Sequence, residues 1–271
     1  MIKRIINKLI YLSLRDRINI LKTLVVNFML LPFKQALHFP ILIYGPCKLG
    51  MLSGKVKFQT KIKKGMLKIG ISDPVRSYHS KTYIDVKGIW VLGHEIILRR
   101  GMNLSISIRG QLTMMNNVTI GTNGTIICNN NIIIGKATSV GNNSVFMDDD
   151  FHHIINTQTR EVKRNKKPIV IGENCWIGGW CTIKKGTQLP NGTIVAGPYS
   201  MVGKNYVDKI SEYSLIAGSP AKLLVENMRR VNNLNSEAYI DKYWAMGNET
   251  FVLPDDIELD DFCLPAMKNR K

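Results

Sequence analysis

The chain has 271 residues, of which 37 are Lys or Arg and 20 are Asp or Glu, so its formal net charge is +17. A hydrophobic content of 45% with 21% charged residues is ordinary for a globular protein and excludes overall disorder. The charge is unevenly placed, because residues 1–64 hold 13 basic residues and one acid, Asp16, while the rest is nearly balanced. This distribution disfavours a nucleic-acid-binding protein and indicates a basic N-terminal segment on a nearly neutral body.

Residues 1–40 are expected to form a basic amphipathic helical segment. Between residues 2 and 31, apolar side chains recur at mostly helical spacings with Lys and Arg between them, and Pro32 and Pro40 end the pattern. Three roles stay open for this segment: it caps the domain that follows, it contacts an anionic membrane surface, or it binds nucleic acid. No recognition motif accompanies the charge, which leaves nucleic acid as the weakest of the three.

The compartment is expected to be the cytoplasm, with peripheral contact at the inner face of the membrane as an open option. The most apolar stretch, residues 24–33, is about half as long as a bilayer span, and the N-terminus lacks the features of a signal peptide. Five scattered cysteines without a Cys-x-x-Cys pair are expected to be small buried residues, not disulfides or a zinc site.

A repeat of six residues appears from about residue 120 onward. From Ile171 the chain divides into IGENCW, IGGWCT, IKKGTQ, LPNGTI, VAGPYS and MVGKNY, and the same phase is visible upstream in IGTNGT, IGKATS and VGNNSV. Each unit begins with an apolar residue and contains small or turn-forming residues. Such a unit supplies one inward side chain to a shared column and then turns, so that neighbouring coils stack.

Residues 147–168 break the repeat and begin Met-Asp-Asp-Asp-Phe-His-His-Ile. Asp and His are good metal ligands, but adjacent His side chains on an extended strand point to opposite sides, which disfavours one shared ion. A solvated polar loop without chemistry is a second interpretation. A third is a general base, because His has the pKa best suited to accept a hydroxyl proton near neutral pH.

A second motif, Ala-Gly-Ser-Pro-Ala-Lys at residues 217–222, follows the last repeat. Together with the repeat and the Asp/His loop, it makes the chain resemble the hexapeptide-repeat acyltransferases, of the sugar O-acetyltransferase type, over roughly residues 60–225. The resemblance implies a mainly β fold, a left-handed parallel β-helix over residues 41–224 with a protruding loop at 147–168. An N-terminal helical segment would precede it, and a C-terminal helix and acidic tail would occupy residues 225–271.

The resemblance implies that His152 is the catalytic base. Asp148, Asp150 and His152 fill the family's Asp-x-Asp/Asn-x-His pattern, and His153 is the alternative register. His152 would accept the proton of a sugar hydroxyl that attacks acetyl-CoA, and Asp150 would hold the imidazole tautomer. Asp148 is assigned to substrate binding, as is Asn123, which falls near a coil position that holds the acceptor sugar in some relatives. No metal is expected.

The same resemblance implies the coenzyme A contacts. Lys222 of the closing motif would pair with phosphate, and Gly179 and Gly197 occupy the small corner positions against which the pantetheine arm lies. Relatives often show Val-Thr-Lys after the last coil. Here those positions read Val202 and Gly203, followed by Lys204. Trp180 stands where relatives have a smaller residue, so the groove is expected to be altered.

The leading functional hypothesis is an acetyl-CoA-dependent O-acetyltransferase acting on a sugar hydroxyl of a surface polysaccharide or its precursor. Implied partners are acetyl-CoA, a sugar or glycan acceptor, and two further copies of the chain in a homotrimer with its active sites between subunits. N-acetylation of a nucleotide-linked amino sugar and a non-catalytic β-helix scaffold are the alternatives.

Overall fold

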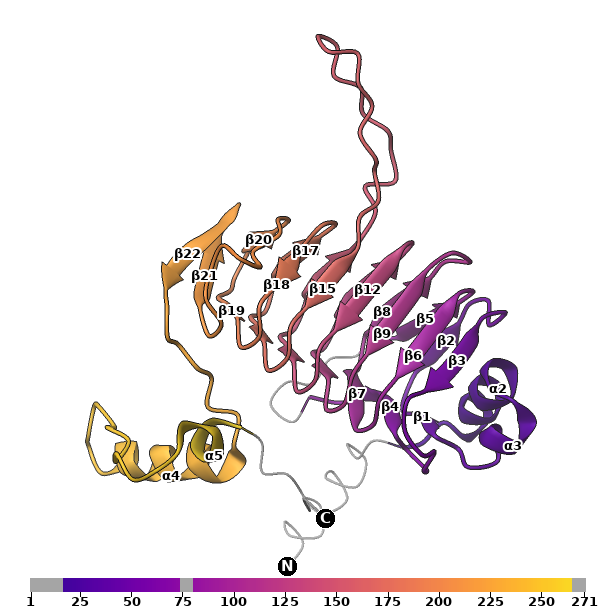
Figure 1. Ribbon diagram of the computed structural model, residues 1–271. Coiled ribbons are helices and arrows are strands. Elements are labelled where there is room, and N and C mark those ends of the chain that lie inside the picture. Colours follow the sequence, from indigo (N-terminus) through magenta and orange to yellow (C-terminus); the bar gives the residue numbers. More distant parts are fainter. Residues whose placement is uncertain (1–16, 74–79, 265–271) are drawn as a thin grey trace, which may run out of the picture.

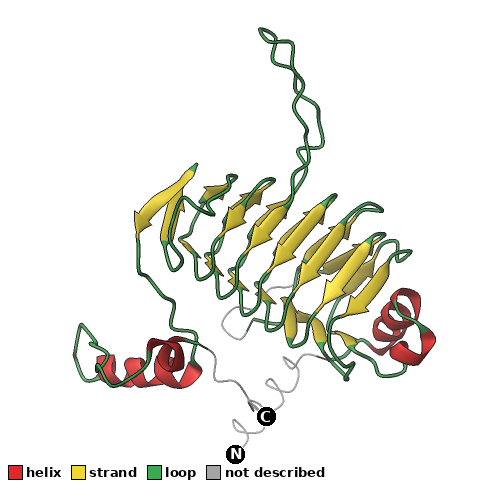
Figure 2. Cartoon of the chain, viewed as in Figure 1, coloured by secondary structure: helices red, strands yellow, loops and turns green. Residues whose placement is uncertain are grey.

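The computed structural model describes residues 17–73 and 80–264, in which the chain winds into a coil of three parallel β-sheets (Figures 1 and 2). Successive strands go to the first, second and third sheet in turn, so each strand pairs in parallel with the strand one coil later. The mainly β fold class and the parallel β-helix expected from the repeat are confirmed. Turns from the first to the second sheet are called the first corner, from the second to the third the second corner, and from the third back to the first the third corner.

The strands fall into three columns along the coil. The first sheet contains β1 (Ile41–Ile43), β4 (Leu67–Ile71), β7 (Ile96–Arg99), β10 (Thr119–Ile120), β13 (Ser139–Val140), β16 (Trp176–Ile177), β19 (Ile194–Val195), β21 (Leu215–Gly218) and β22 (Ala221–Val225). The second sheet contains β2 (Cys47–Leu49), β5 (Thr82–Val86), β8 (Asn103–Ile106), β11 (Thr125–Cys128), β14 (Val145–Met147), β17 (Thr182–Lys184) and β20 (Met201–Val202). The third sheet contains β3 (Lys55–Phe58), β6 (Ile89–Leu92), β9 (Gln111–Met114), β12 (Asn131–Ile134), β15 (Ile169–Ile171) and β18 (Gln188–Leu189).

The first residue of the six-residue units forms the core, except in the last unit, where Val202 is buried and in register with Ile183 while Met201 is partly exposed. Ile120, Val140, Ile177 and Val195 stand in register on successive strands of the first sheet, and all four are buried. Burial of one such aliphatic side chain contributes roughly 1.5–3 kcal/mol, so the stacked columns supply the main stabilisation of the coil.

The coil length changes along the chain. Ile171 is in register with Leu189, eighteen positions on, which is three units of six. Upstream, Ile120 is in register with Val140, twenty positions on, and Leu98 with Ile120, twenty-two positions on. The six-residue phase read upstream is therefore kept in the strands but not in the corners, which take up the extra residues. Corners face solvent and are free to lengthen, whereas the inward column fixes the spacing within each strand.

Two helices lie at the N-terminal end of the coil, α2 (Ile20–Leu30) and α3 (Phe33–Ala36), beside β1 and β3 (Figure 1). Pro32 separates them, as its lack of a backbone N–H requires. The part of the expected N-terminal helical segment that falls on residues 1–16 lies outside the described residues. Within 17–73 and 80–264, no helix is both long and apolar enough to cross a bilayer.

The coil closes at its C-terminal end with an antiparallel hairpin, because β22 folds back onto β21. The helix expected from residue 225 onward begins later, as α4 (Leu234–Ala245), where the Asn233 side chain accepts a hydrogen bond from the backbone N–H of Asn235. The acidic tail contributes a short helix, α5 (Leu259–Cys263).

Two arginines join the C-terminal segment to the coil. The guanidinium of Arg229 lies 4.4 Å from the ring centroid of Tyr213 and 2.6 Å from a carboxylate oxygen of Asp260, and that of Arg230 lies 5.2 Å from the ring of Trp176. Trp176 is therefore a docking residue for the C-terminal segment.

Candidate active site

The second corner carries a projecting loop over residues 148–168, between β14 and β15 (Figure 1). Its two limbs run antiparallel, with bridges between Asp149 and Lys166 and between Ile155 and Val162. At the tip, the side chain of Asn156 accepts hydrogen bonds from the backbone N–H groups of two following residues, which forms the turn. Residues 151–164 are exposed, so only the base of the loop is held by the coil.

Asp148 is fully buried at this base. One of its carboxylate oxygens accepts the backbone N–H of Asn129 at 2.8 Å, and the other accepts that of Asn130 at 2.9 Å and lies 3.7 Å from the Cys128 sulfur. Burial raises the pKa of Asp148, an effect that the backbone hydrogen bonds reduce. In the structure Asp148 ties the start of the loop to the preceding coil, and its assignment to substrate binding stays a prediction.

Asp149 fixes the direction in which the loop leaves the coil. Its carboxylate accepts hydrogen bonds from the backbone N–H of Phe151 and the side-chain amide of Asn129, and lies 3.3 Å from the ammonium of Lys166. Burial acts to raise the pKa of Asp149, but these hydrogen bonds and the lysine charge outweigh it, so the pKa lies below its usual value. The motif assigned no role to Asp149, because this residue falls between the motif positions Asp148 and Asp150.

Asp150 pairs with a lysine of the next coil. The carboxylate of Asp150 lies 2.6 Å from the ammonium of Lys185, and both side chains are about a quarter exposed. Among the described residues, no hydrogen bond joins the side chains of Asp150 and His152. The expectation that Asp150 holds the imidazole tautomer is therefore not met in this conformation, in which Lys185 satisfies the carboxylate.

Lys185 is a site residue that the sequence reasoning missed. The register that pairs Met147 with Lys184 continues by one step, which places Lys185 one coil beyond the start of the loop. The repeat spacing contained this signal, but the loop insertion between the two coils concealed it.

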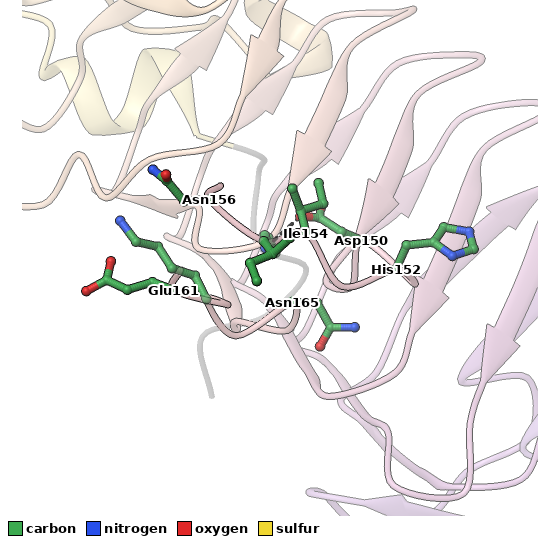
Figure 3. Close-up of a pocket in the computed structure, with 9 residues that line it drawn as sticks. Asp150, His152, Ile154, Asn156, Glu161 and Asn165 are labelled. Atoms are coloured by element: carbon green, nitrogen blue, oxygen red, sulfur yellow. Dashed lines mark ion pairs between the residues drawn. The ribbon is translucent and has the colours of Figure 1, made fainter. Parts of the chain in front are cut away.

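His152 lies at the base of the loop and lines a pocket of about 420 Å³ (Figure 3). Its imidazole points away from the side chains of Asn156 and Glu161, which lie on the far side of the loop (Figure 3). His153 is exposed and is not among the residues that line the pocket. The polar lining consists of Asp150, His152, Asn156, Glu161, Lys163, Asn165 and Lys185.

The cysteines are unsuited to act as nucleophiles. Cys128, Cys175 and Cys181 are buried, and all five cysteines are free thiols. Burial raises the pKa of Cys175 to about 12 and that of Cys128 further still, so neither forms a thiolate near neutral pH. The expectation that the five cysteines are small buried residues is confirmed for these three and for Cys263, whereas Cys47 is half-buried.

Gly179 and Gly197 lie together at the first corner. A Cβ added to Gly197 would lie 2.4 Å from the carbonyl oxygen of Gly179, so the approach of the two coils requires glycine there. A Cβ on Gly179 would lie 3.1 Å from the carbonyl oxygen and 3.6 Å from the backbone nitrogen of Asn142, so it also meets the backbone of the preceding coil. Both glycines therefore have a packing reason for being glycine, and the reason is stronger for Gly197.

An aromatic pair flanks these glycines. The exposed rings of Trp180 and Tyr199 lie 6.1 Å apart between centroids, and both residues have a positive φ at their corners. This strained conformation is uncommon for large residues. The sequence indicated Trp180 as an unusual groove residue, whereas Tyr199 was not foreseen.

The closing hairpin lies against the same corner. The hydroxyl of Ser200 accepts the backbone N–H of Gly218, which joins the hairpin turn to the first corner. Lys222 lies on β22 with its side chain exposed. The turn of the closing motif and the two glycines therefore occupy neighbouring positions at one end of the coil.

The last two residues that the sequence assigned to the site, Asn123 and Lys204, lie at different corners. Asn123 is a first-corner residue with a positive φ, and its side-chain amide donates to the side chain of Asn143 on the next coil. Lys204 is exposed at the second corner, where its carbonyl accepts the backbone N–H of Gln188. The ladder contact gives Asn123 a structural role at a corner that does not carry His152.

One chain thus divides the expected site between two corners. The second corner carries His152, Asp150 and Lys204, and the first corner carries Gly179 and Gly197, with Asn123 and the closing hairpin on the same side. Within the described ranges, no group of three or more His, Cys, Asp or Glu side chains is placed to hold a metal ion. Fold and site together define a parallel β-helix protein with a projecting Asp/His loop.

Comparison with known proteins gives the following similarities. No family model matches the chain. A Klebsiella pneumoniae protein described as an uncharacterized 24.8 kDa protein in cps region is 27% identical over 226 residues, which cover 83% of this chain and 96% of that protein.

The solved structures that the chain is similar to include two acetyltransferases of polysialic acid. The polysialic acid O-acetyltransferase OatWY is 22% identical, with 82% of this chain and 94% of that chain covered and a TM-score of 0.45. The polySia-specific acetyltransferase NeuO is 17% identical, with 77% and 88% covered and a TM-score of 0.44.

Proposed function

We propose that the protein is an acetyl-CoA-dependent O-acetyltransferase that acetylates a sugar hydroxyl, with His152 as the general base. The observation that carries this proposal is the position of His152, on the wall of a pocket at the base of a loop that three consecutive Asp residues hold in place. An exposed imidazole on a fixed backbone is suited to accept a hydroxyl proton near neutral pH.

The reaction follows from these roles. His152 takes the proton of the attacking hydroxyl while its oxygen bonds to the thioester carbonyl carbon of acetyl-CoA. The tetrahedral intermediate collapses with cleavage of the carbon–sulfur bond, and the imidazolium returns the proton to the coenzyme A thiolate. The products are an acetyl ester and free coenzyme A. Backbone N–H groups at a coil corner would stabilise the oxyanion.

Coenzyme A is assigned to the corner that carries Gly179 and Gly197. Gly179 and Gly197 place no side chains beside the pantetheine arm, and the exposed Trp180 and Tyr199 rings offer it an apolar surface. Lys222 and Lys204 are the candidate phosphate contacts, since both side chains are exposed cations.

A homotrimer is part of this proposal. His152 and the glycine corner belong to different corners of one chain, so a complete site would use the second corner of one subunit and the first corner of a neighbour. The exposed apolar side chains of the loop, Phe151, Ile154 and Val162, support insertion against another subunit, since about half or more of each side chain faces solvent.

The proposed acceptor is a surface polysaccharide or its precursor. The Klebsiella pneumoniae relative described as lying in a cps region supports this choice. N-acetylation of a nucleotide-linked amino sugar uses the same base and donor, so the test must separate an ester product from an amide.

The test measures coenzyme A release from acetyl-CoA, using surface polysaccharide of the source strain from which acetyl esters have been removed by mild base. The wild-type protein is expected to release coenzyme A and to leave an acetyl group that mild alkali removes. His152→Ala is expected to lower kcat by about two to four orders of magnitude.

His153→Ala is the matched control, because it removes the neighbouring exposed imidazole outside the pocket. Full activity in His152→Ala would refute the mechanism, and loss in His153→Ala alone would move the base by one residue. An alkali-resistant product would favour the N-acetyltransferase, and no coenzyme A release would favour the scaffold.

A further inference from the structure

Helix α2 is oriented with its polar side chains inward. Thr23 and Asn27 are buried against the coil, together with Val26 and Leu30. An ordinary surface helix packs its apolar side on the core and turns its polar side to water. In α2 the outward side is apolar instead.

The inward polar residues have a clear task. β1 is the terminal strand of the first sheet, so the backbone groups on its outer edge have no neighbouring strand. The hydroxyl of Thr23 accepts the backbone N–H of Ile43 at 3.1 Å, and the Asn27 side chain accepts the N–H of Ile41 at 3.2 Å and donates to its carbonyl at 2.7 Å. Helix α2 therefore caps the outer edge of β1 in place of a further strand. Its polar side chains face inward because they form these hydrogen bonds.

The outward side forms what we call the α2–α3 apolar face. Leu21 and Phe33 are 67% and 68% exposed, and the ring centroids of Phe28 and Phe33 lie 5.6 Å apart, which joins the two helices into one surface. Contiguous exposed apolar surface of this kind marks an interaction site. Its members are Ile20, Leu21, Leu24, Val25, Phe28, Met29, Phe33 and Leu37.

The surrounding surface is strongly cationic. Between residues 17 and 73, one acidic residue, Asp73, stands against ten basic residues: Arg17, Lys22, Lys34, Lys48, Lys55, Lys57, Lys61, Lys63, Lys64 and Lys68. Lys22 and Lys34 lie on the two helices themselves, and β1, β2 and β3 of the adjoining first coil lie beside them (Figure 1). This end of the coil is therefore apolar at its tip and basic around it.

We infer that the α2–α3 apolar face binds the surface of a bilayer that contains anionic lipid. Leucine and phenylalanine side chains enter the boundary between head groups and acyl chains, while the surrounding lysines pair with anionic head groups. A second copy of the chain placed on the same face would bring two cationic ends together, which the charge opposes. This attachment is independent of the chemistry proposed for the loop.

The test is co-sedimentation of the full-length protein with vesicles of phosphatidylcholine containing about one third phosphatidylserine. The wild-type protein is expected to sediment with these vesicles, weakly with phosphatidylcholine alone, and less in about 0.5 M salt. The variant Leu21→Gln/Leu24→Gln/Phe33→Gln is expected to lose binding by about tenfold or more.

The matched control is Leu234→Gln/Met246→Gln/Val252→Gln, which removes three apolar side chains at the other end of the chain that are at least as exposed, and it is expected to bind normally. Lys34→Glu/Lys63→Glu reverses two positive charges and leaves helix α2 unchanged. It is expected to weaken binding to anionic vesicles but not to vesicles of phosphatidylcholine alone. The proposal would be overturned if the variant Leu21→Gln/Leu24→Gln/Phe33→Gln sedimented as strongly as the wild type, or if the wild type did not sediment with vesicles. It would also be overturned if changes on the α2–α3 apolar face altered only the oligomeric state, which would indicate a protein interface.

Discussion

The carboxylate of Asp150 and the ammonium of Lys185 lie 2.6 Å apart, and this pair joins the base of the projecting loop to the coil that follows it. The pair lies on the wall of the same pocket as His152. The ion pair therefore helps to hold the loop segment that carries His152 and has a positioning role, not a catalytic one. Because both side chains are partly exposed, its contribution to the stability of the whole fold is small.

Lys185→Met and Asp150→Asn are each expected to lower kcat by about tenfold, because either change releases the loop segment that carries His152. The double variant is expected to lose little more than either single variant, since both remove the same pair. Thermal unfolding of the three variants should stay close to that of the wild type. Additive losses in kcat would contradict a shared positioning role and point to separate contacts with the substrate.

Asp149→Asn is expected to lower the free energy of unfolding by about 1–3 kcal/mol at pH 7, because the Phe151 N–H and Lys166 lose a charged partner. The folded-state pKa of Asp149 lies below its usual value, so its stabilising effect is present above the unfolded pKa of about 3.9. That effect is lost as the pH falls through the lower, folded pKa. Urea unfolding at pH 7 and at about pH 3.5 should show the gap between wild type and variant narrowing; a constant gap would disprove this account.

Gly179→Ala and Gly197→Ala separate cofactor contact from coil packing. Gly197→Ala is expected to lower the unfolding temperature markedly, because its Cβ would lie 2.4 Å from the Gly179 carbonyl oxygen. Gly179→Ala is expected to lower the unfolding temperature less, because its Cβ would lie 3.1 Å from the Asn142 carbonyl oxygen, and to raise KM for acetyl-CoA severalfold, since the resulting shift of this corner changes the proposed groove. Calorimetry and initial-rate kinetics on both variants measure this, and an unchanged KM in Gly179→Ala would remove Gly179 from the proposed groove.

Arg230→Ala is expected to loosen the C-terminal segment without affecting the coil. The guanidinium stacks on Trp176, a contact that contributes about 0.5–2 kcal/mol. Limited proteolysis should cut the variant faster between residues 226 and 258 while the coil stays intact. Lys209→Ala, which changes an exposed cation away from this contact, serves as the control and should be cut at the wild-type rate.

The parallel β-helix could be predicted because its signal is local and repeated. Ile171, Ile177 and Leu189 each begin a six-residue unit, and all three side chains are buried in the core. The lengthened upstream corners could not be foreseen, since solvent-facing turns place no constraint on the pattern. The orientation of α2 was equally hidden, because it depends on an unpaired edge of β1 that exists only once the coil has formed.

The sequence alone determined that the positive charge of this protein is concentrated in its N-terminal quarter. The sequence also determined the coil and the position of the Asp/His loop, since both depend on residue order along the strand. Only the tertiary structure decided that Asp148 is a buried tether and that Asp150 pairs with Lys185, because those partners come from different coils. It likewise decided that the glycines and His152 lie at separate corners, since a coil brings together residues one full turn apart and keeps neighbouring corners on different edges.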